Sequence, residues 1–140
     1  MSVDNIKMAQ QFTEAIPHVK ALGMQLTEIG QGRAEMRVPY DPRFIGDPES
    51  GVIHGGAVFA LLDTTCGAAV MCHPSAAVEE VAGNLLIDYM RAATPGQAIR
   101  TRAHCYRLTS SVAFVRAEAL DDDDDLPVAT ASGAFTVAAN

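Results

Sequence analysis

The pattern of apolar positions predicts one long helix that is apolar on nearly every side. Residues 55–72 are apolar or small apart from a single charged side chain, Asp63, and Pro74 ends the run. A helix without a polar face belongs in the interior of a fold, where a lone carboxylate is costly unless it is paired or used. The turn before it, His54-Gly55-Gly56, leaves free N–H groups at the helix N-terminus, which favour negative charge. We therefore take Asp63 and this glycine turn as candidate functional groups.

Shorter periodic segments predict the rest of the fold. Residues 4–16 carry apolar side chains at helical spacing before Pro17, which predicts a short amphipathic helix, and residues 41–51 are rich in Pro and Gly, which predicts a loop. Apolar and polar positions alternate along six segments, which predicts strands at 23–29, 33–38, 84–90, 97–107, 111–120 and 127–138. This order favours an α+β fold in which a curved antiparallel sheet of about six strands wraps around one long central helix. No repeat or linker divides the chain, so a single domain over residues 1–140 is expected.

Composition and charge narrow the functional classes. The formal net charge of −7 argues against a nucleic-acid partner, and the long apolar run is interrupted by Asp63, so no membrane segment is expected. The first residues lack the basic region of a signal peptide, and Cys66, Cys72 and Cys105 have no paired spacing, which together predict the cytoplasm. The histidines have no metal-ligand spacing, so no metal is expected.

Two sets of charged residues in the second half of the chain are also explained by exposure to solvent, without a functional role. The run Asp121–Asp125 is expected to be an exposed turn between the last two strands. The arginines of the strands are either phosphate contacts or ordinary exposed strand residues, and the sequence leaves both open.

Two segments together carry a resemblance to a known family. The first is His54-Gly55-Gly56, with Asp63 nine residues after the histidine and Thr64-Thr65-Cys66-Gly67 directly behind it. The second runs from Ile87-Asp88-Tyr89-Met90-Arg91 to Thr94-Pro95-Gly96. In these motifs, and in the order of elements from about residue 20 to 138, the chain resembles the hotdog-fold thioesterases, most closely the phenylacetic-acid-pathway (PaaI-like) acyl-CoA thioesterases.

The resemblance implies a hydrolase that splits an acyl-CoA thioester into free acid and coenzyme A without a cofactor. It implies that Asp63 acts as general base or nucleophile and that the Gly55 amide polarises the thioester carbonyl. His54 is expected to shape the turn and to contact the substrate. The further substrate-binding residues that the resemblance suggests are Gly56, Asn84, Arg91, Arg107, Ser110 and Ser111.

Two departures from the family keep other functions open. Pro48 stands where the family often has an asparagine, and Ala82 stands where a hydroxyl residue often faces the catalytic acid. A non-catalytic acyl-CoA binding or sensor protein is therefore the alternative. A hotdog dehydratase or hydratase is disfavoured, because those enzymes pair a catalytic histidine with a carboxylate in a different motif.

Helical geometry predicts an oligomer. Asp63 follows Gly55 by eight residues, or about 12 Å along a helix axis. A general base and an oxyanion donor must each lie within about 3 Å of the atoms they serve, so one chain does not easily supply both. A second copy packed antiparallel would bring its Asp63 to this Gly55. We therefore expect a homodimer or a dimer of dimers with shared sites.

Overall fold

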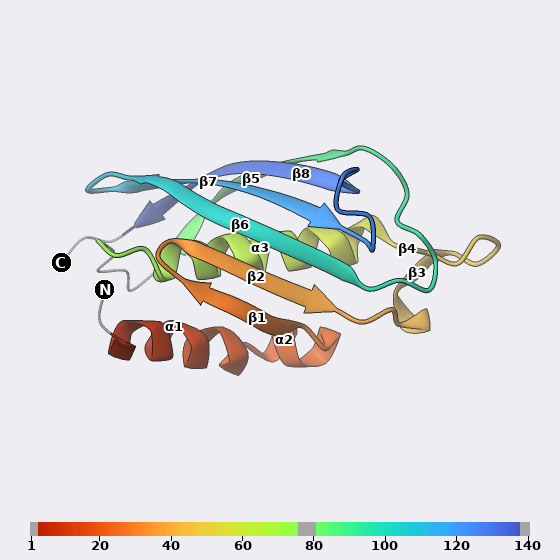
Figure 1. The fold of residues 1–140 in the computed structure, drawn as a ribbon, viewed down its shortest axis with the longest axis horizontal. Coiled ribbons are helices and arrows are strands. Elements are labelled where there is room, and N and C mark those ends of the chain that lie inside the picture. The colour runs from red at the N-terminus through yellow and green to blue at the C-terminus, as the bar shows by residue number, and fades with distance from the viewer. Residues whose placement is uncertain (1–2, 76–80, 138–140) are drawn as a thin grey trace.

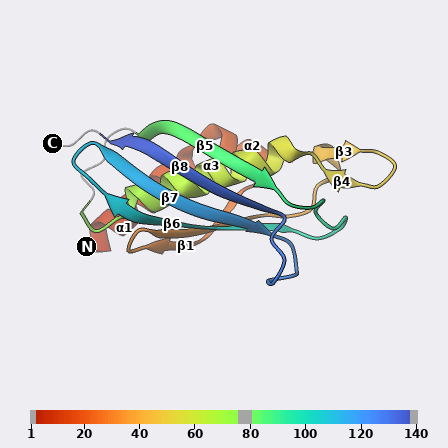
Figure 2. The ribbon, with the colours of Figure 1, turned by 90° about the horizontal axis from the view of Figure 1, so that it is seen from above.

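The computed structural model describes residues 3–75 and 81–137, in which six strands form one antiparallel sheet in the order β1-β2-β6-β7-β8-β5. The strands are β1 (Gln25–Gly30), β2 (Arg33–Val38), β5 (Val81–Tyr89), β6 (Ile99–Leu108), β7 (Val112–Leu120) and β8 (Ala129–Val137). The long helix α3 (Gly55–Met71) lies across one face of this curved sheet (Figures 1 and 2). This confirms the expected α+β hotdog arrangement.

Helix α3 buries one face against the sheet and leaves the other open. Val58, Leu61 and Leu62 pack into a cluster at its N-terminal half, and Cys66 and Val70 pack into a second cluster at its C-terminal half. On the open side, Gly56, Phe59 and Asp63 are exposed at the spacing of one helical stripe. The prediction of a helix buried all round, with a buried carboxylate, is therefore wrong for the single chain: none of the residues that the structure describes covers that stripe.

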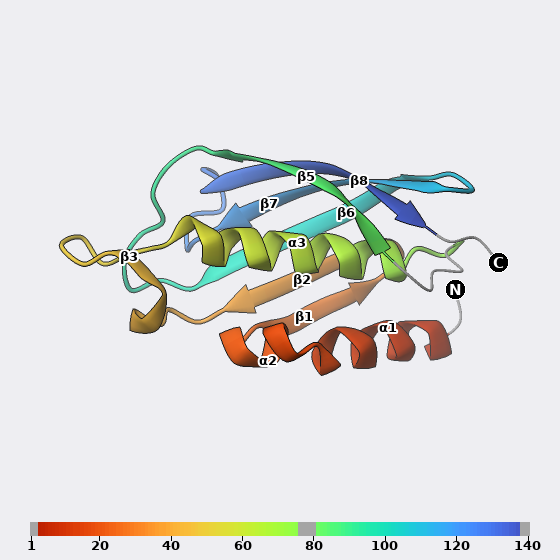
Figure 3. The same cartoon turned by 180° about the vertical axis from the view of Figure 1, so that it is seen from behind.

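The N-terminal region holds more structure than the pattern predicted. Helix α1 (Val3–Ala15) is followed by a second helix, α2 (Pro17–Leu22), and both lie beside β1 (Figure 3). Pro17 ends the first helix as expected, yet it also begins the second, because proline is well tolerated in the first turn of a helix.

The predicted loop over 41–51 contains short elements of its own. A 3₁₀ turn, η1 (Pro42–Phe44), is capped by Asp41 and leads into the small hairpin of β3 (Ile45–Asp47) and β4 (Val52–Ile53). This hairpin delivers the chain to the start of α3.

The acidic run contains a buried anchor, which corrects the expectation of an exposed turn. The Asp121 side chain is 1% exposed and accepts two hydrogen bonds from the Arg91 guanidinium, at 2.6 and 2.8 Å. It also accepts hydrogen bonds from the Thr94 N–H and hydroxyl. The other four aspartates of the run are exposed, as expected. Asp121 therefore ties the β7–β8 connection to the segment that follows β5.

Candidate active site

The N-terminus of α3 is shaped by the side chain that precedes it. His54 is the N-cap residue in an extended conformation, and its Nδ1 accepts the N–H of Gly56 at 2.8 Å. The His54 N–H in turn donates to the Phe44 carbonyl at 2.7 Å. Gly46 lies so close that a Cβ there would meet the His54 Cα at 2.9 Å, so the hairpin packs against the histidine only with glycine at this position.

Tyr89 holds the same turn from the sheet. Its hydroxyl donates to the Gly55 carbonyl at 2.8 Å, and its ring lies 3.4 Å from the point where a Cβ on Gly55 would stand. The peptide between Gly55 and Gly56 is thus held at its N–H by His54 and at its carbonyl by Tyr89. The Gly55 N–H itself makes no hydrogen bond within the described part of the chain, so it is a free donor at the positive end of a 17-residue helix.

Two grooves flank this first turn of α3. One, of about 320 Å³, reaches Gly55 and is lined mainly by apolar side chains, among them Ile53, Val58, Met90 and Val128. The other, of about 250 Å³, reaches Gly56 and is lined by His18, Leu22, Phe44, His54, Ala57 and Ala60. The residue with the free donor, Gly55, lines the first groove, and its neighbour Gly56 lines the second, an arrangement that suits a ligand with a polar centre and apolar arms.

Asp63 lies two turns further along the same helix. Its partial desolvation by the surrounding protein raises its pKa above the usual value, and the nearby His18 opposes this shift. Because α3 is an unbroken helix from Gly55 to Met71, the eight-residue separation corresponds to about 12 Å between Gly55 and Asp63. Within one chain, the carboxylate and the free N–H do not converge.

Cys66, one turn after Asp63, is the thiol nearest in sequence to this carboxylate. It is fully buried, and desolvation by burial raises its pKa to about 12. The thiol stays protonated at neutral pH and is no candidate nucleophile.

The remaining predicted residues are spread over the molecule. Arg91 has its guanidinium engaged by Asp121 and by the carbonyls of Ala92 and Leu126. Asn84 alternates with the inward-facing Leu85 and therefore points away from α3. The side chain of Ala82 falls outside the described residues, and Pro48 lies in the exposed turn between β3 and β4.

Arg107, Ser110 and Ser111 lie around the β6–β7 hairpin. This hairpin is at the end of the sheet where α3 ends, opposite the end that carries Gly55 (Figure 1). A second copy with an antiparallel α3 would place this end near its own glycine turn. Within one chain, these three residues, like Asp63, do not meet the turn.

The sequence did not predict two residues that contact the turn from other elements, Tyr89 and Gly46. Tyr89 belongs to the second motif of the resemblance, and its place at the end of a strand, in phase with Leu85 and Ile87, indicates an inward-facing side chain. The role of Gly46 could not be predicted from the sequence, because it depends on close packing against His54.

The described residues contain no cluster of three or more His, Cys, Asp or Glu side chains able to hold a metal ion. None of the helices in this part of the chain combines the length and hydropathy needed to cross a membrane.

Comparison with known proteins defines the family. The model of the thioesterase superfamily matches residues 50–128, which include the glycine turn, all of α3 and the segment around Arg91. The chain therefore belongs to the thioesterase superfamily.

Individual relatives cover nearly the whole chain. The medium/long-chain acyl-CoA thioesterase YigI of Salmonella typhimurium is 25% identical over 93% of this chain and 91% of its own length. A Pseudomonas aeruginosa protein of solved structure is 38% identical, with a TM-score of 0.82 over 94% of this chain and 98% of that one. The Escherichia coli PaaI protein from the phenylacetic acid degradation operon shares the fold, with a TM-score of 0.81 at 18% identity, over 95% and 92% of the two chains.

Proposed function

We propose that this protein is an acyl-CoA thioesterase whose active sites form between two copies of the chain. The observation that carries the proposal is the free Gly55 N–H beside an apolar groove, with a second apolar groove at Gly56, on the same helix as Asp63. Membership of the thioesterase superfamily supports thioester hydrolysis, and the YigI relatives support acyl-CoA as the substrate class.

The Gly55 N–H acts on the thioester carbonyl. Attack at the carbonyl carbon moves negative charge to its oxygen, and a free N–H at a helix N-terminus stabilises that charge. Removal of one such donor typically costs about 3 kcal/mol of transition-state stabilisation. His54 and Tyr89 hold the adjoining peptide at its N–H and carbonyl, so the donor is oriented before the substrate arrives.

Asp63 of the partner subunit brings about the attack on the thioester carbonyl carbon in one of two ways. As a general base, the carboxylate takes a proton from water while the water oxygen bonds to the carbonyl carbon. The tetrahedral intermediate then expels the coenzyme A thiolate and leaves the free acid. As a nucleophile, the carboxylate itself bonds to the carbonyl carbon and expels the thiolate, and water hydrolyses the resulting anhydride. Both routes need ionised Asp63, so the raised pKa of this group predicts loss of activity as the pH falls.

The exposed stripe of α3 supports the shared site. Gly56, Phe59 and Asp63 lie along the side of the helix that the sheet does not cover, and Phe59 is 44% exposed. A second α3 packed antiparallel on this stripe buries Phe59 and moves one chain's Asp63 toward the other chain's turn. The assembly is a homodimer or a dimer of such dimers.

A second candidate function is acyl-CoA binding without hydrolysis. It is favoured by Pro48, which stands where related enzymes often carry an asparagine and has no side-chain donor to orient water. Hydrolysis predicts thiol release by the wild type and its loss in the Asp63→Asn variant, whereas binding alone predicts ligand binding by the wild type without thiol release.

The test measures thiol release from a series of linear acyl-CoAs of increasing chain length and from an aryl-acetyl-CoA. We expect wild-type turnover and a loss of 100-fold or more in kcat for Asp63→Asn, the range typical of acid–base catalysis. Binding of a non-hydrolysable acyl-CoA thioether should stay unchanged.

Asp122→Asn is the matched control, since it removes one carboxylate from an exposed position in the acidic run and should keep full activity. Thioether binding without wild-type thiol release would contradict hydrolysis and favour the binding function. Full turnover by Asp63→Asn would remove Asp63 from the mechanism.

A further inference from the structure

The groove beside Gly56 is lined by a histidine that the proposed mechanism does not use. His18 lies on α2, which faces the first turns of α3 across this groove of about 250 Å³. On the α3 side the groove is lined by Gly56, Ala57 and Ala60. Because these three residues are small, they leave space between the His18 imidazole and the surface of the helix.

Asp63 lies next to this groove on the same helix. It follows Ala60 by three residues, and side chains three residues apart on an α-helix are neighbours, with about 5–6 Å between their Cβ atoms. His18 and Asp63 are both exposed. The imidazole therefore lies on the side of α3 that carries the carboxylate, with Ala60 between the two.

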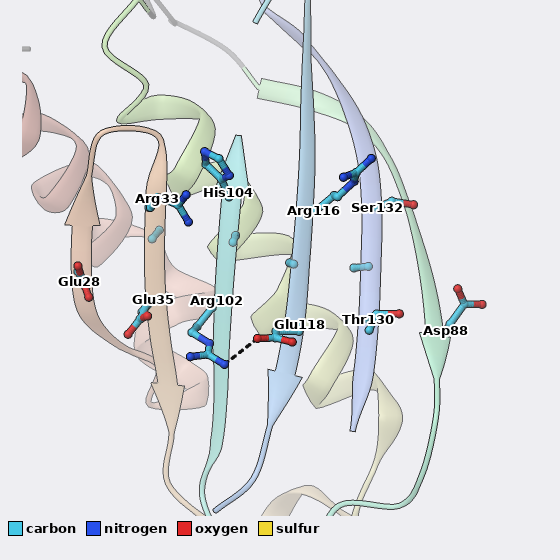
Figure 4. A pocket seen from close by; sticks show the side chains of 14 residues that line it. Glu28, Arg33, Glu35, Asp88, Arg102, His104, Arg116, Glu118, Thr130 and Ser132 are labelled. Carbon is cyan, nitrogen blue, oxygen red and sulfur yellow. Dashed lines mark hydrogen bonds and ion pairs between the residues drawn. The ribbon is translucent and has the colours of Figure 1, made fainter. Parts of the chain in front are cut away.

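The side chains of His18 and Asp63 have no other partner. Within the described part of the chain, neither side chain makes a hydrogen bond or an ion pair. Charged side chains elsewhere do pair: on the face of the sheet opposite α3, the Arg102 guanidinium lies 2.7 Å from the Glu118 carboxylate (Figure 4). The imidazole and the carboxylate are thus free to interact with each other.

The surroundings of Asp63 favour its neutral form, and His18 opposes them. Desolvation raises the pKa of Asp63, and the charge of His18 lowers it. The thiol of Cys66, one turn further on, is protonated and brings no charge. The strands packed against α3 turn uncharged side chains toward it, among them Thr101, Tyr89 and Cys105.

The other titratable groups on this side of the molecule have their own partners or face water. His54 accepts the Gly56 N–H at the start of α3. Besides His18, the described charged side chains of α1 and α2 are those of Lys7, Glu14 and Lys20, which are exposed. The charge that acts on Asp63 is therefore that of His18.

We propose that His18 is a positioning residue of the proposed active site, in which its imidazolium is the electrostatic partner of the Asp63 carboxylate. His18 has this role in catalysis only if Asp63 is the base or nucleophile, so the inference rests on the proposed function. Both residues belong to one chain, so His18 accompanies Asp63 to the glycine turn of the partner subunit. Exclusion of water by that contact strengthens the attraction between the two charges.

The charge of an imidazole depends on pH, which limits the range in which His18 acts. A histidine gains its positive charge as the pH falls through about 6.5, the direction in which Asp63 becomes protonated and inactive. An opposite charge favours the ionised carboxylate, so loss of His18 shifts the protonation of Asp63 to higher pH. At about pH 8 an imidazole is neutral, and its loss has no such effect.

The test compares pH profiles of kcat/KM, which report ionisations of the free enzyme, with hydrolysis followed by the loss of thioester absorbance. His18→Gln should lower kcat/KM about threefold on the acid side, the size typical of an exposed charge pair, and should leave the plateau near pH 8 unchanged. His18→Lys carries a positive charge throughout this range and should restore the acid side. Lys20→Gln is the matched control, since it removes a positive charge from the same helix by the same replacement and should keep the wild-type profile.

Carbon-13 NMR of the Asp63 carboxyl measures the same effect without catalysis. Its titration midpoint should lie at higher pH in His18→Gln than in the wild type and should be unchanged in Lys20→Gln. Circular dichroism verifies that each variant is folded.

Three results would overturn the pairing. They are an unchanged midpoint in folded His18→Gln, an equal loss of kcat/KM at every pH, which a structural role gives, and a His18→Lys profile no better than that of His18→Gln. A wild type without thiol release, combined with a higher midpoint in His18→Gln, contradicts the proposed function but supports the charge pair.

Discussion

Removing the Asp121 carboxylate should destabilise the protein far more than removing any other carboxylate of the acidic run. The side chain is 1% exposed and accepts hydrogen bonds from Arg91, from Thr94 and from the Asp123 N–H. In Asp121→Ala these donors lose their acceptor, and the Arg91 guanidinium is left without its counter-ion.

The magnitude follows from the burial of the pair. Removing one partner of a buried ion pair typically costs about 3–5 kcal/mol. The Arg91 side chain is 28% exposed and gains some hydration, which places the expected cost near the lower end, about 3 kcal/mol. For a domain of this size, one kcal/mol moves the Tm by about 4 °C, so the expected fall in Tm is about 12 °C.

Thermal melts of Asp121→Ala and Asp124→Ala provide the assay. Asp124 also pairs with an arginine, Arg100, but its side chain is 66% exposed, so Asp124→Ala should barely change the Tm. The Arg91 guanidinium holds the pKa of Asp121 well below its usual range. The stabilisation by Asp121 is therefore present above about pH 4 and is lost as the pH falls below it. Equal melting temperatures for the two variants at neutral pH would refute the anchoring role of Asp121.

Two further predictions concern the proposed site. Tyr89→Phe removes the hydrogen bond to the Gly55 carbonyl and should lower kcat about fivefold at unchanged KM, which corresponds to about 1 kcal/mol. Tyr40→Phe removes a similar bond to the Gly51 carbonyl, away from the turn, and equal losses in both variants would contradict a positioning role for Tyr89. Asp63→Asn should raise the Tm slightly at neutral pH, because the raised pKa shows that the folded state disfavours the charged carboxylate. That gain should vanish below about pH 4, where aspartate is protonated in both states, and a gain independent of pH would contradict the assignment.

Much of the fold could be predicted because its elements are strongly periodic. The alternation over 111–120 and the apolar run from Gly55 each fit one kind of element, and both elements lie within about a residue of their expected ends. Features that depend on contacts distant in sequence were missed. Asp121 is one of five consecutive aspartates, and nothing local distinguishes it from the other four until Arg91 lies beside it.

In the candidate site, too, features set by the local sequence could be predicted, and features set by distant contacts could not. The His54-Gly55-Gly56 turn could be predicted, because a glycine turn before an apolar run indicates a helix N-terminus. The exposure of Asp63 could not, since the apolar character of α3 reflects both the sheet on one side and an uncovered stripe on the other. Hydrophobicity alone does not distinguish packing within a chain from packing between chains.

The proposed sharing of each active site between two subunits is tested most directly by complementation between two inactive variants. Gly55→Pro removes the free N–H at a position that suits proline, because Gly55 is the first residue of α3 and His54 before it is extended. Gly55→Ala keeps the N–H and serves as its control. Asp63→Ala removes the carboxylate.

Subunits of the Gly55→Pro and Asp63→Ala variants are mixed, and their exchange is verified by native mass spectrometry. In each mixed dimer one of the two sites combines an intact Gly55 with an intact Asp63. With equal mixing half of the dimers are mixed, so we predict recovery of about a quarter of the wild-type thiol release per chain. Verified exchange without recovered thiol release would contradict the shared site.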